Sequence, residues 1–236
     1  MNIIIDQGNT AIKLAQFEGE KIIEKFYFKR SDIILVNHWI KTNVKKTDRI
    51  IISSVTNDRL EIDNENIVYL TAETPLPIVL GYDTPETLGK DRIANAVAIW
   101  ALNEHKDSLC IDLGTCIKYD LVSRDGVYLG GNISPGMEMR YKALAHFTDK
   151  LPLVNPQPYR TKYGVDTTTS IVHGVQEAIK HEINGFITRY TNEFIDLTIF
   201  MTGGDLNYFD KVYKNSIFAN SDLTVVGLNE ILIYNA

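Results

Sequence analysis

The sequence lacks any apolar run long enough to span a bilayer, and it has no dense stripe of lysine and arginine. Its 236 residues carry a net charge of −6, which repels a polyanion such as DNA overall. The N-terminus runs directly into an apolar segment, without a basic leader or a cleavage site. We therefore expect no nucleic-acid partner, no membrane partner and no secretory signal. A small anionic substrate is still compatible with this net charge, because a few hydrogen-bond donors at a binding site outweigh the weak repulsion from the protein as a whole.

Cysteine is also scarce. Cys110 and Cys116 are the only two, which is too few for a disulfide framework, so we expect reduced thiols. The hydrophobic fraction of 44% and the charged fraction of 23% are ordinary for a globular protein. The chain is long enough for one large domain or for two small ones that each bury a core.

Two similar turns carry the first functional signal. The first is DQGNTAIK at residues 6–13, and the second is DLGTCIK at residues 112–118. Each turn follows an apolar run and places an aspartate, a glycine, a polar turn residue and a lysine in the same order. A chain that makes one turn twice, once in each half, is predicted to contain two similar lobes.

The chemistry of the first turn suits phosphate. Gly8 lets the backbone approach a ligand closely, Asn9 and Thr10 supply donors, and Lys13 supplies a positive charge. Asp6 would act through a cation or an oriented water. The turn is not a Walker loop, because GKS or GKT is missing and the following residues alternate as a strand. The alternative is a plain hairpin with common turn residues, and the second copy favours the phosphate interpretation.

Strand and helix patterns alternate along the chain, which predicts an α/β fold. The simplest arrangement is two related lobes, residues 1–102 and 103–236, with a cleft between them. Strands are expected at 3–5, 11–17, 22–28, 49–55, 67–71, 109–111, 117–122, 197–201 and 223–228, and helices at 32–46, 92–102, 137–147 and 170–194, with a short helix at the C-terminus.

The stretch GKDR at residues 89–92 opens the second of these helices, and Thr87 or a nearby residue is a candidate cap. In one interpretation Asp91 is an acid favoured by the helix dipole and Arg92 is a surface residue. In the other, Asp91 is a base for a substrate hydroxyl, while Arg92 and the helix N–H groups hold an anionic group. Two glycine-rich stretches, 130–136 and 202–205, are either generic loops or places where a nucleotide approaches the backbone.

Taken in order, these motifs resemble type III pantothenate kinase, a family of the actin-like, sugar-kinase superfamily of duplicated ribonuclease-H-like folds. The resemblance spans nearly the whole chain. Cys116 stands where the family usually has alanine or threonine, and Asp166 stands where it usually has asparagine. The matching stretches are DQGNTAIK at 6–13, YDTPETLGKDRIANA at 82–96, IDLGTCIKYD at 111–120, GGNISPG at 130–136, GVDTTTSIVHG at 164–174 and TGGDL at 202–206.

The resemblance implies ATP-dependent phosphorylation of pantothenate to 4′-phosphopantothenate, the first step of coenzyme A synthesis, by a cytoplasmic homodimer. It implies Mg²⁺ with ATP and a monovalent cation, K⁺ or NH₄⁺, at Asp112. Asp91 would be the catalytic base. Asp6, Gln7, Gly8, Asn9, Thr10, Ala11, Ile12, Lys13 and Thr115 would bind ATP, and Tyr82, Gly89, Lys90, Asp91, Arg92 and Thr167 would bind pantothenate.

Two alternatives remain open from the sequence. One is a sugar kinase of the same superfamily. The other is a nucleotide-binding regulator of the same family that has lost turnover, although retention of Asp91 and of both acidic turns counts against it.

Overall fold

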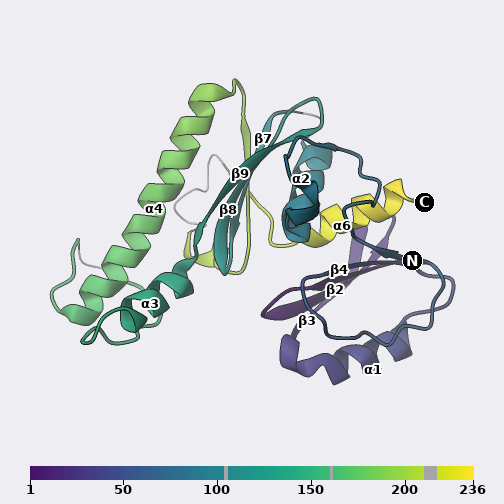
Figure 1. Ribbon diagram of the computed structural model, residues 1–236, viewed down its shortest axis with the longest axis horizontal. Coiled ribbons are helices and arrows are strands. Elements are labelled where there is room, and N and C mark those ends of the chain that lie inside the picture. The colour runs from purple at the N-terminus through teal and green to yellow at the C-terminus, as the bar shows by residue number, and fades with distance from the viewer. Residues whose placement is uncertain (104–105, 160–161, 210–216) are drawn as a thin grey trace. The chain divides into compact units, whose positions relative to one another are not determined.

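The computed structural model describes residues 1–103, 106–159, 162–209 and 217–236 (Figure 1). The chain forms two compact units. Unit 1 comprises Met1–His105, Val122–Leu129 and Asp222–Ala236, and unit 2 comprises Lys106–Leu121 and Gly130–Ser221. Strands and helices alternate in both, which confirms the predicted α/β class. The predicted lobe boundary between residues 102 and 103 stays a prediction.

The sheet of unit 1 has the strand order β3-β2-β1-β4-β5. Strands β1, β2 and β3 are antiparallel neighbours, whereas β4 and β5 run parallel to β1. Alternating isoleucines of β1 and β4 face the core that α1 covers, and α6 packs against β1, β2 and β4. The bounds are β1 Asn2–Gln7, β2 Ala11–Glu18, β3 Lys21–Lys29, α1 Ile33–Asn43, β4 Arg49–Ser54, β5 Ile67–Tyr69 and α6 Leu223–Tyr234.

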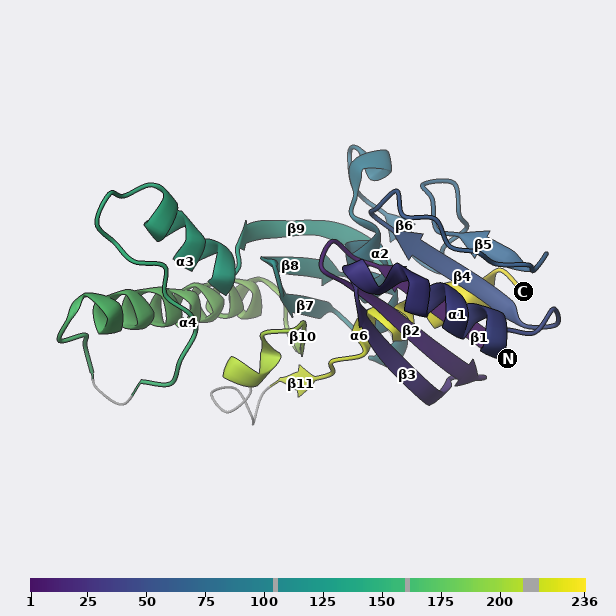
Figure 2. The same ribbon diagram turned by 90° about the horizontal axis from the view of Figure 1, so that it is seen from below.

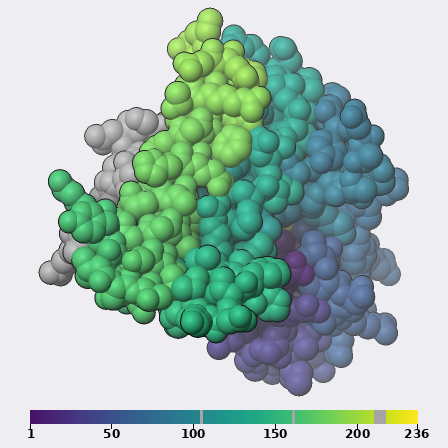
Figure 3. Space-filling view, turned by 60° about the vertical axis from the view of Figure 1, so that its left-hand side comes forward, coloured from purple at the N-terminus to yellow at the C-terminus, as the bar shows by residue number. Residues whose placement is uncertain are grey.

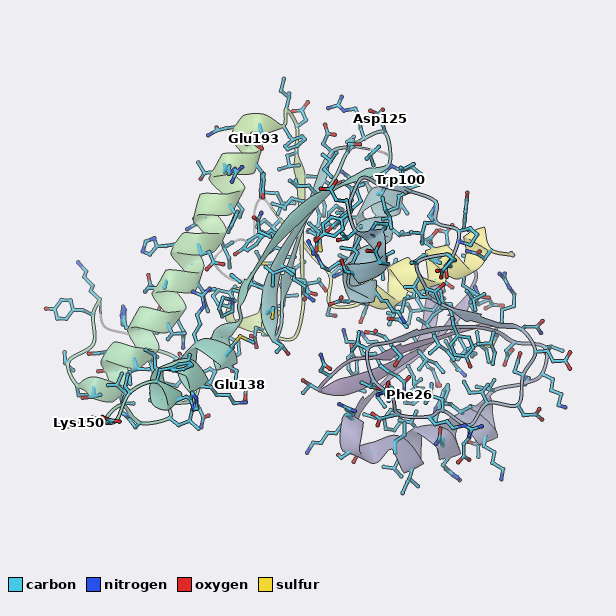
Figure 4. All side chains as sticks on the ribbon, viewed as in Figure 1. Phe26, Trp100, Asp125, Glu138, Lys150 and Glu193 are labelled. Atoms are coloured by element: carbon cyan, nitrogen blue, oxygen red, sulfur yellow. The ribbon has the colours of Figure 1, made fainter. Side chains whose placement is uncertain are left out.

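Aromatic packing holds α1 against β3. Phe26, labelled in Figure 4, lies on β3, and its ring centroid is 5.1 Å from that of Trp39 on α1. Phe28 packs against the same cluster. Because aromatic rings bury a large apolar area, this contact fixes the helix on its face of the sheet.

Helix α2 (Lys90–Leu102) packs along α6, as Figure 1 shows. A Cβ at Gly227 would lie 1.8 Å from the carbonyl oxygen of Ala94, so the two backbones touch at this glycine. The prediction of a strand at 223–228 was wrong, because these residues form the first half of α6. The run LTVVGL has strand-like composition, but burial of nearly all its side chains against α2 and the sheet stabilises a helix.

Thr87 is not the cap of α2. It closes a short 3₁₀ turn, Pro85–Thr87, and Gly89 is the residue that precedes the helix. At the other end of α2, Trp100 packs on the turn that contains Asp125, and both residues are labelled in Figure 4. This turn joins β8 (Cys116–Val122) to β9 (Val127–Pro135), whose first residues pair with β6 (Val79–Leu80).

Unit 2 is built on the strand order β11-β10-β7-β8-β9 (Figure 2). Every residue of β7 is buried, as expected for a strand with neighbours on both sides. The side chains of β7 and β8 pack with those of α3 and α4 in one core. The bounds are β7 Ser108–Leu113, β8 Cys116–Val122, β9 Val127–Pro135, α3 Met137–His146, α4 Thr167–Glu193, β10 Thr198–Thr202 and β11 Phe218–Ala219.

Helix α4 is longer than the predicted 170–194 at its start, and it runs without a break through Gly174 and Gly185. It begins at Thr167 because Asp166 and Thr169 form a capping box: the Asp166 carboxylate accepts the Thr169 N–H at 2.8 Å, and the Thr169 hydroxyl accepts the Asp166 N–H at 3.1 Å. Among the described residues, no helix has both the length and the apolar character that crossing a membrane requires.

Candidate active site

The first acidic turn lies at the end of β1, the central strand of the unit 1 sheet. Asp6 belongs to β1 itself, and the tight connection to β2 comprises residues 8–10. The Gly8 N–H donates to the Ala11 carbonyl at 3.0 Å and closes the turn. Asp6 is paired across the ladder with Lys13 of β2, which places a lysine beside the carboxylate. Asn9 and Thr10 are exposed, as donors to a ligand need to be.

The start of α2 is tied to the same edge of the sheet. Lys90 Nζ donates to the carbonyl oxygen of Ser54, the last residue of β4, at 3.0 Å. Because β1 and β4 are parallel neighbours, their carboxyl ends meet at one edge. Within unit 1, this hydrogen bond therefore brings the GKDR segment to the edge that carries Asp6.

Asp91 folds back over the glycine that precedes its helix. A Cβ at Gly89 would lie 2.7 Å from Asp91 Oδ1 and 3.6 Å from the Arg92 stem, so only glycine leaves room for this carboxylate. The side chain is half-buried at the N-terminus of α2. Helix dipoles favour the ionised carboxylate at that position, which is the form a proton acceptor needs.

Arg92 is buried, with 5% of its surface exposed, so it is not the surface residue of the simpler interpretation. Its guanidinium carbon lies 5.9 Å from the ring centroids of both Tyr82 and Tyr128. The two rings meet edge to face, with centroids 6.0 Å apart. Tyr128 was given no role from the sequence, because it precedes the glycine-rich stretch 130–136 and belongs to none of the matching motifs.

The second acidic turn has the same construction in unit 2. Asp112 lies near the end of the buried strand β7, and Thr115 is exposed in the turn. Lys118, on the returning strand β8, places its Nζ 2.7 Å from Asp112 Oδ2. We assigned Lys118 no role from the sequence, although its motif repeats the lysine of the first turn.

Two glycines allow neighbouring backbone segments to pack closely against this second turn. A Cβ at Gly136 would lie 2.1 Å from the Gly114 carbonyl oxygen, and the Gly136 N–H donates to Thr115 at 3.0 Å. A Cβ at Gly203, which has a φ of 102°, would lie 2.2 Å from the Leu113 carbonyl oxygen and 2.6 Å from Asp112 Oδ1. Close backbone packing inside unit 2 therefore accounts for one glycine in each of the two glycine-rich stretches.

Further carboxylates lie near Asp112. Burial, followed by the charges of Glu138 and Asp112, raises the pKa of Asp205 to about 6. Glu138, labelled in Figure 4, is in the first turn of α3. Among the residues that the structure describes, no group of three histidine, cysteine or acidic side chains is arranged to hold a metal ion. The carboxylates of Asp112, Glu138 and Asp205 make the charge around the second turn negative, and the Lys118 ammonium partly balances it.

Thr167 lies at the first turn of α4, on a cavity of about 760 Å³ between α3 and α4. Figure 3 shows these two helices side by side on the near face of the molecule. The lining is mostly apolar and includes Ile171, Val175 and Ala178. Hydrogen bonds from Thr169 lower the pKa of Asp166, the neighbouring cap. Aspartate and asparagine are both favoured N-caps, which explains why the departure at residue 166 keeps the helix.

Comparisons with known proteins agree on one family. The family model described as type III pantothenate kinase matches residues 2–189. The type III pantothenate kinase of Christiangramia forsetii is 43% identical over 240 residues, covering 100% of this chain and 99% of that protein. The one from Phocaeicola vulgatus is 42% identical over 239 residues, with the same coverage of 100% and 99%.

A solved structure extends the likeness to the fold. A proposed 2-dehydro-3-deoxygalactonokinase from Sinorhizobium meliloti superposes with a TM-score of 0.62 at 12% identity, covering 100% of this chain and 99% of that one. At this identity the match concerns the fold alone, and it supports the two lobes predicted from the repeated turns and the actin-like fold implied by the family resemblance. By sequence over its full length, the chain belongs to the type III pantothenate kinase family.

Proposed function

We infer that this protein transfers the γ-phosphoryl group of ATP to pantothenate and forms 4′-phosphopantothenate, the first step of coenzyme A synthesis. Membership of the type III pantothenate kinase family carries this conclusion, since relatives of that name match the chain from end to end. No observation favours the sugar kinase or the inactive regulator as an alternative.

We propose that the first turn binds the phosphates of ATP. Asn9 and Thr10 are exposed there, and Lys13 adds a positive charge across the ladder from Asp6. Thr115 offers a second exposed hydroxyl from the other turn. Mg²⁺ bound with ATP would be held largely through phosphate oxygens and water, and it would supply positive charge beside the transferred group.

We propose that Asp91 is the general base. Phosphoryl transfer depends on positioning and on charge more than on covalent chemistry. The Asp91 carboxylate orients the primary hydroxyl of pantothenate and accepts its proton as the new P–O bond forms. Arg92 lies against the rings of Tyr82 and Tyr128, and its buried guanidinium suits the pantothenate carboxylate because a charge with little solvent around it acts strongly.

The monovalent cation implied by the resemblance remains a prediction, and the residues at Asp112 do not fit it well. The Lys118 ammonium is already 2.7 Å from the Asp112 carboxylate that would bind this cation. No step of the mechanism is therefore assigned to a potassium or ammonium ion.

We propose that the protein acts as a cytoplasmic homodimer. Thr167 would then reach pantothenate bound to the second subunit. The mostly apolar cavity beside Thr167, between α3 and α4, supports this arrangement, because an apolar surface of this kind gains from being covered.

ADP release from ATP, measured against pantothenate and a panel of sugars, tests the proposed function. We expect pantothenate alone to respond. A response to a sugar would indicate the sugar kinase, and ATP binding without ADP release would indicate the regulator.

Two variants test the role of Asp91. In Asp91→Asn, turnover is expected to fall ~10²–10⁴-fold, because the amide cannot accept the proton. In Gly89→Ala, the new methyl group displaces the Asp91 carboxylate, and we expect a loss of up to ~10²-fold from misplacement alone. Glu86→Gln, at an exposed acid on the preceding turn, is the matched control and should keep wild-type turnover. Near-normal turnover of the Asn variant would remove Asp91 from this role.

A further inference from the structure

We propose that the Lys118 ammonium takes the place of a monovalent cation beside Asp112, so that phosphoryl transfer by this protein needs no added potassium or ammonium. The inference rests on the proposed function and concerns the charge that supports it. It assigns a catalytic-site role to Lys118. This lysine belongs to the second acidic turn, but the sequence alone gave it no function.

The ion pair between Lys118 and Asp112 is short and sheltered. Nζ and Oδ2 are 2.7 Å apart, and the two side chains are 15% and 11% exposed. Water and salt screen a pair with so little exposure much less than a surface pair. Both residues are on strands inside the unit 2 sheet, so the backbone holds the lysine on the same side of the turn as the carboxylate.

The chemistry of the two cations matches. A lysine side chain ends in a compact ammonium with a single positive charge and three N–H donors. It therefore presents to the Asp112 carboxylate the charge and the hydrogen bonds of an ammonium ion. Because the lysine is tethered to β8, its effective concentration at the carboxylate does not depend on the ions in solution.

The negative charges around the second turn explain why the Lys118 ammonium is needed there. Burial raises the pKa of Asp205, and the nearby charges of Glu138 and Asp112 raise it further. Three carboxyl groups therefore lie next to the turn that is predicted to meet ATP. A polyphosphate approaching that turn would be repelled unless positive charge were present. Lys118 supplies such charge permanently.

The first turn provides an internal comparison. There, Lys13 of the returning strand β2 is the ladder partner of Asp6. In the second turn, Lys118 of the returning strand β8 forms an ion pair with Asp112. Each acidic turn of this chain is thus followed by a lysine on the returning strand.

Turnover of the wild-type protein is measured with pantothenate and MgATP while KCl or NH₄Cl replaces choline chloride at constant ionic strength. We expect a change of less than about twofold. In Lys118→Met, which keeps the length of the side chain, turnover in choline chloride is expected to fall ~10²-fold and to recover in NH₄Cl or KCl. Lys118→Arg should keep the charge and the independence from added ions, and Lys150→Met, at an exposed lysine of the same unit, is the matched control.

Thermal unfolding provides a readout that does not depend on turnover. The wild-type midpoint should be equal in KCl and choline chloride, and that of Lys118→Met should rise in KCl, since an ion that binds the folded state stabilises it. A wild-type protein that is strongly activated or stabilised by K⁺ would overturn the proposal, as would full activity of Lys118→Met without either ion. If Lys118→Met does not fold, the wild-type ion series alone decides. Absence of ADP formation in every salt would instead count against the proposed function.

Discussion

At the scale of single residues, the site depends on charged side chains whose positions are fixed by the groups packed against them. The Asp91 carboxylate occupies space that any side chain at residue 89 would take. Arg92 is fixed by two tyrosine rings, and Asp112 by an ammonium. Each charged group therefore has a defined position before substrate arrives, which is what positioning and electrostatic catalysis require.

Asp205 gives a prediction about pH. Burial and the charges of Glu138 and Asp112 raise its pKa to about 6 in the folded protein, above the ordinary value of 3.8. The folded state therefore binds the proton more tightly than the unfolded state, and ionisation of Asp205 destabilises the fold as the pH rises from about 4 through about 6. Asp205→Asn removes this effect, so its free energy of unfolding should exceed that of the wild type by an amount that grows over this range and then stays constant.

Urea denaturation of both proteins at a series of pH values measures this difference. Asp149→Asn, at an exposed acid of the same unit, is the control and should show no such growth. A gap between Asp205→Asn and the wild type that is independent of pH would mean that the Asp205 pKa is not raised.

At the scale of elements, helices and strands are held by close backbone approaches that glycine allows. Gly227 brings α6 against the backbone of α2, and Gly136 brings the start of α3 against the second turn. The capping box of Asp166 and Thr169 sets where α4 begins. Within each unit, these contacts fix how closely the helices pack and where α4 begins.

Gly227→Ala is predicted to be strongly destabilising. Its new Cβ would lie 1.8 Å from the Ala94 carbonyl oxygen, so α2 and α6 must separate. We expect a loss of at least ~2 kcal/mol in the free energy of unfolding, as for other overpacked sites. Gly185→Ala is the matched control, because no atom lies within 4 Å of the added Cβ. Alanine there should stabilise α4 by about 0.5–1 kcal/mol. Denaturant unfolding of both variants measures this contrast, and a similar effect of the two substitutions would contradict it.

At the scale of the whole molecule, the proposed homodimer has a direct test. Sedimentation velocity should give a mass of about twice the 26.7 kDa of one chain at the concentrations used for assays. The physical reason is the mostly apolar cavity between α3 and α4, which loses contact with water if a second subunit covers it. A mass of 26.7 kDa at every concentration would exclude the dimer.

The sequence by itself determined those features that depend on neighbouring residues. A short apolar run predicted β1, and alternating apolar residues predicted β2. The acidic turns were visible as a repeated motif, and GKDR at 89–92 correctly marked the start of α2. The order of the motifs was sufficient to identify the family. These features follow from local backbone preferences and from the spacing of apolar side chains, which can be read along the chain.

Tertiary structure alone decided the features that depend on residues far apart in the sequence. Residues 223–228 have strand-like composition, but they are helical because α6 is buried against α2. Arg92 is covered by Tyr128, which comes 36 positions later in the chain (128 − 92). Burial and ion pairing depend on which side chains meet after folding, so composition and periodicity could not predict these contacts.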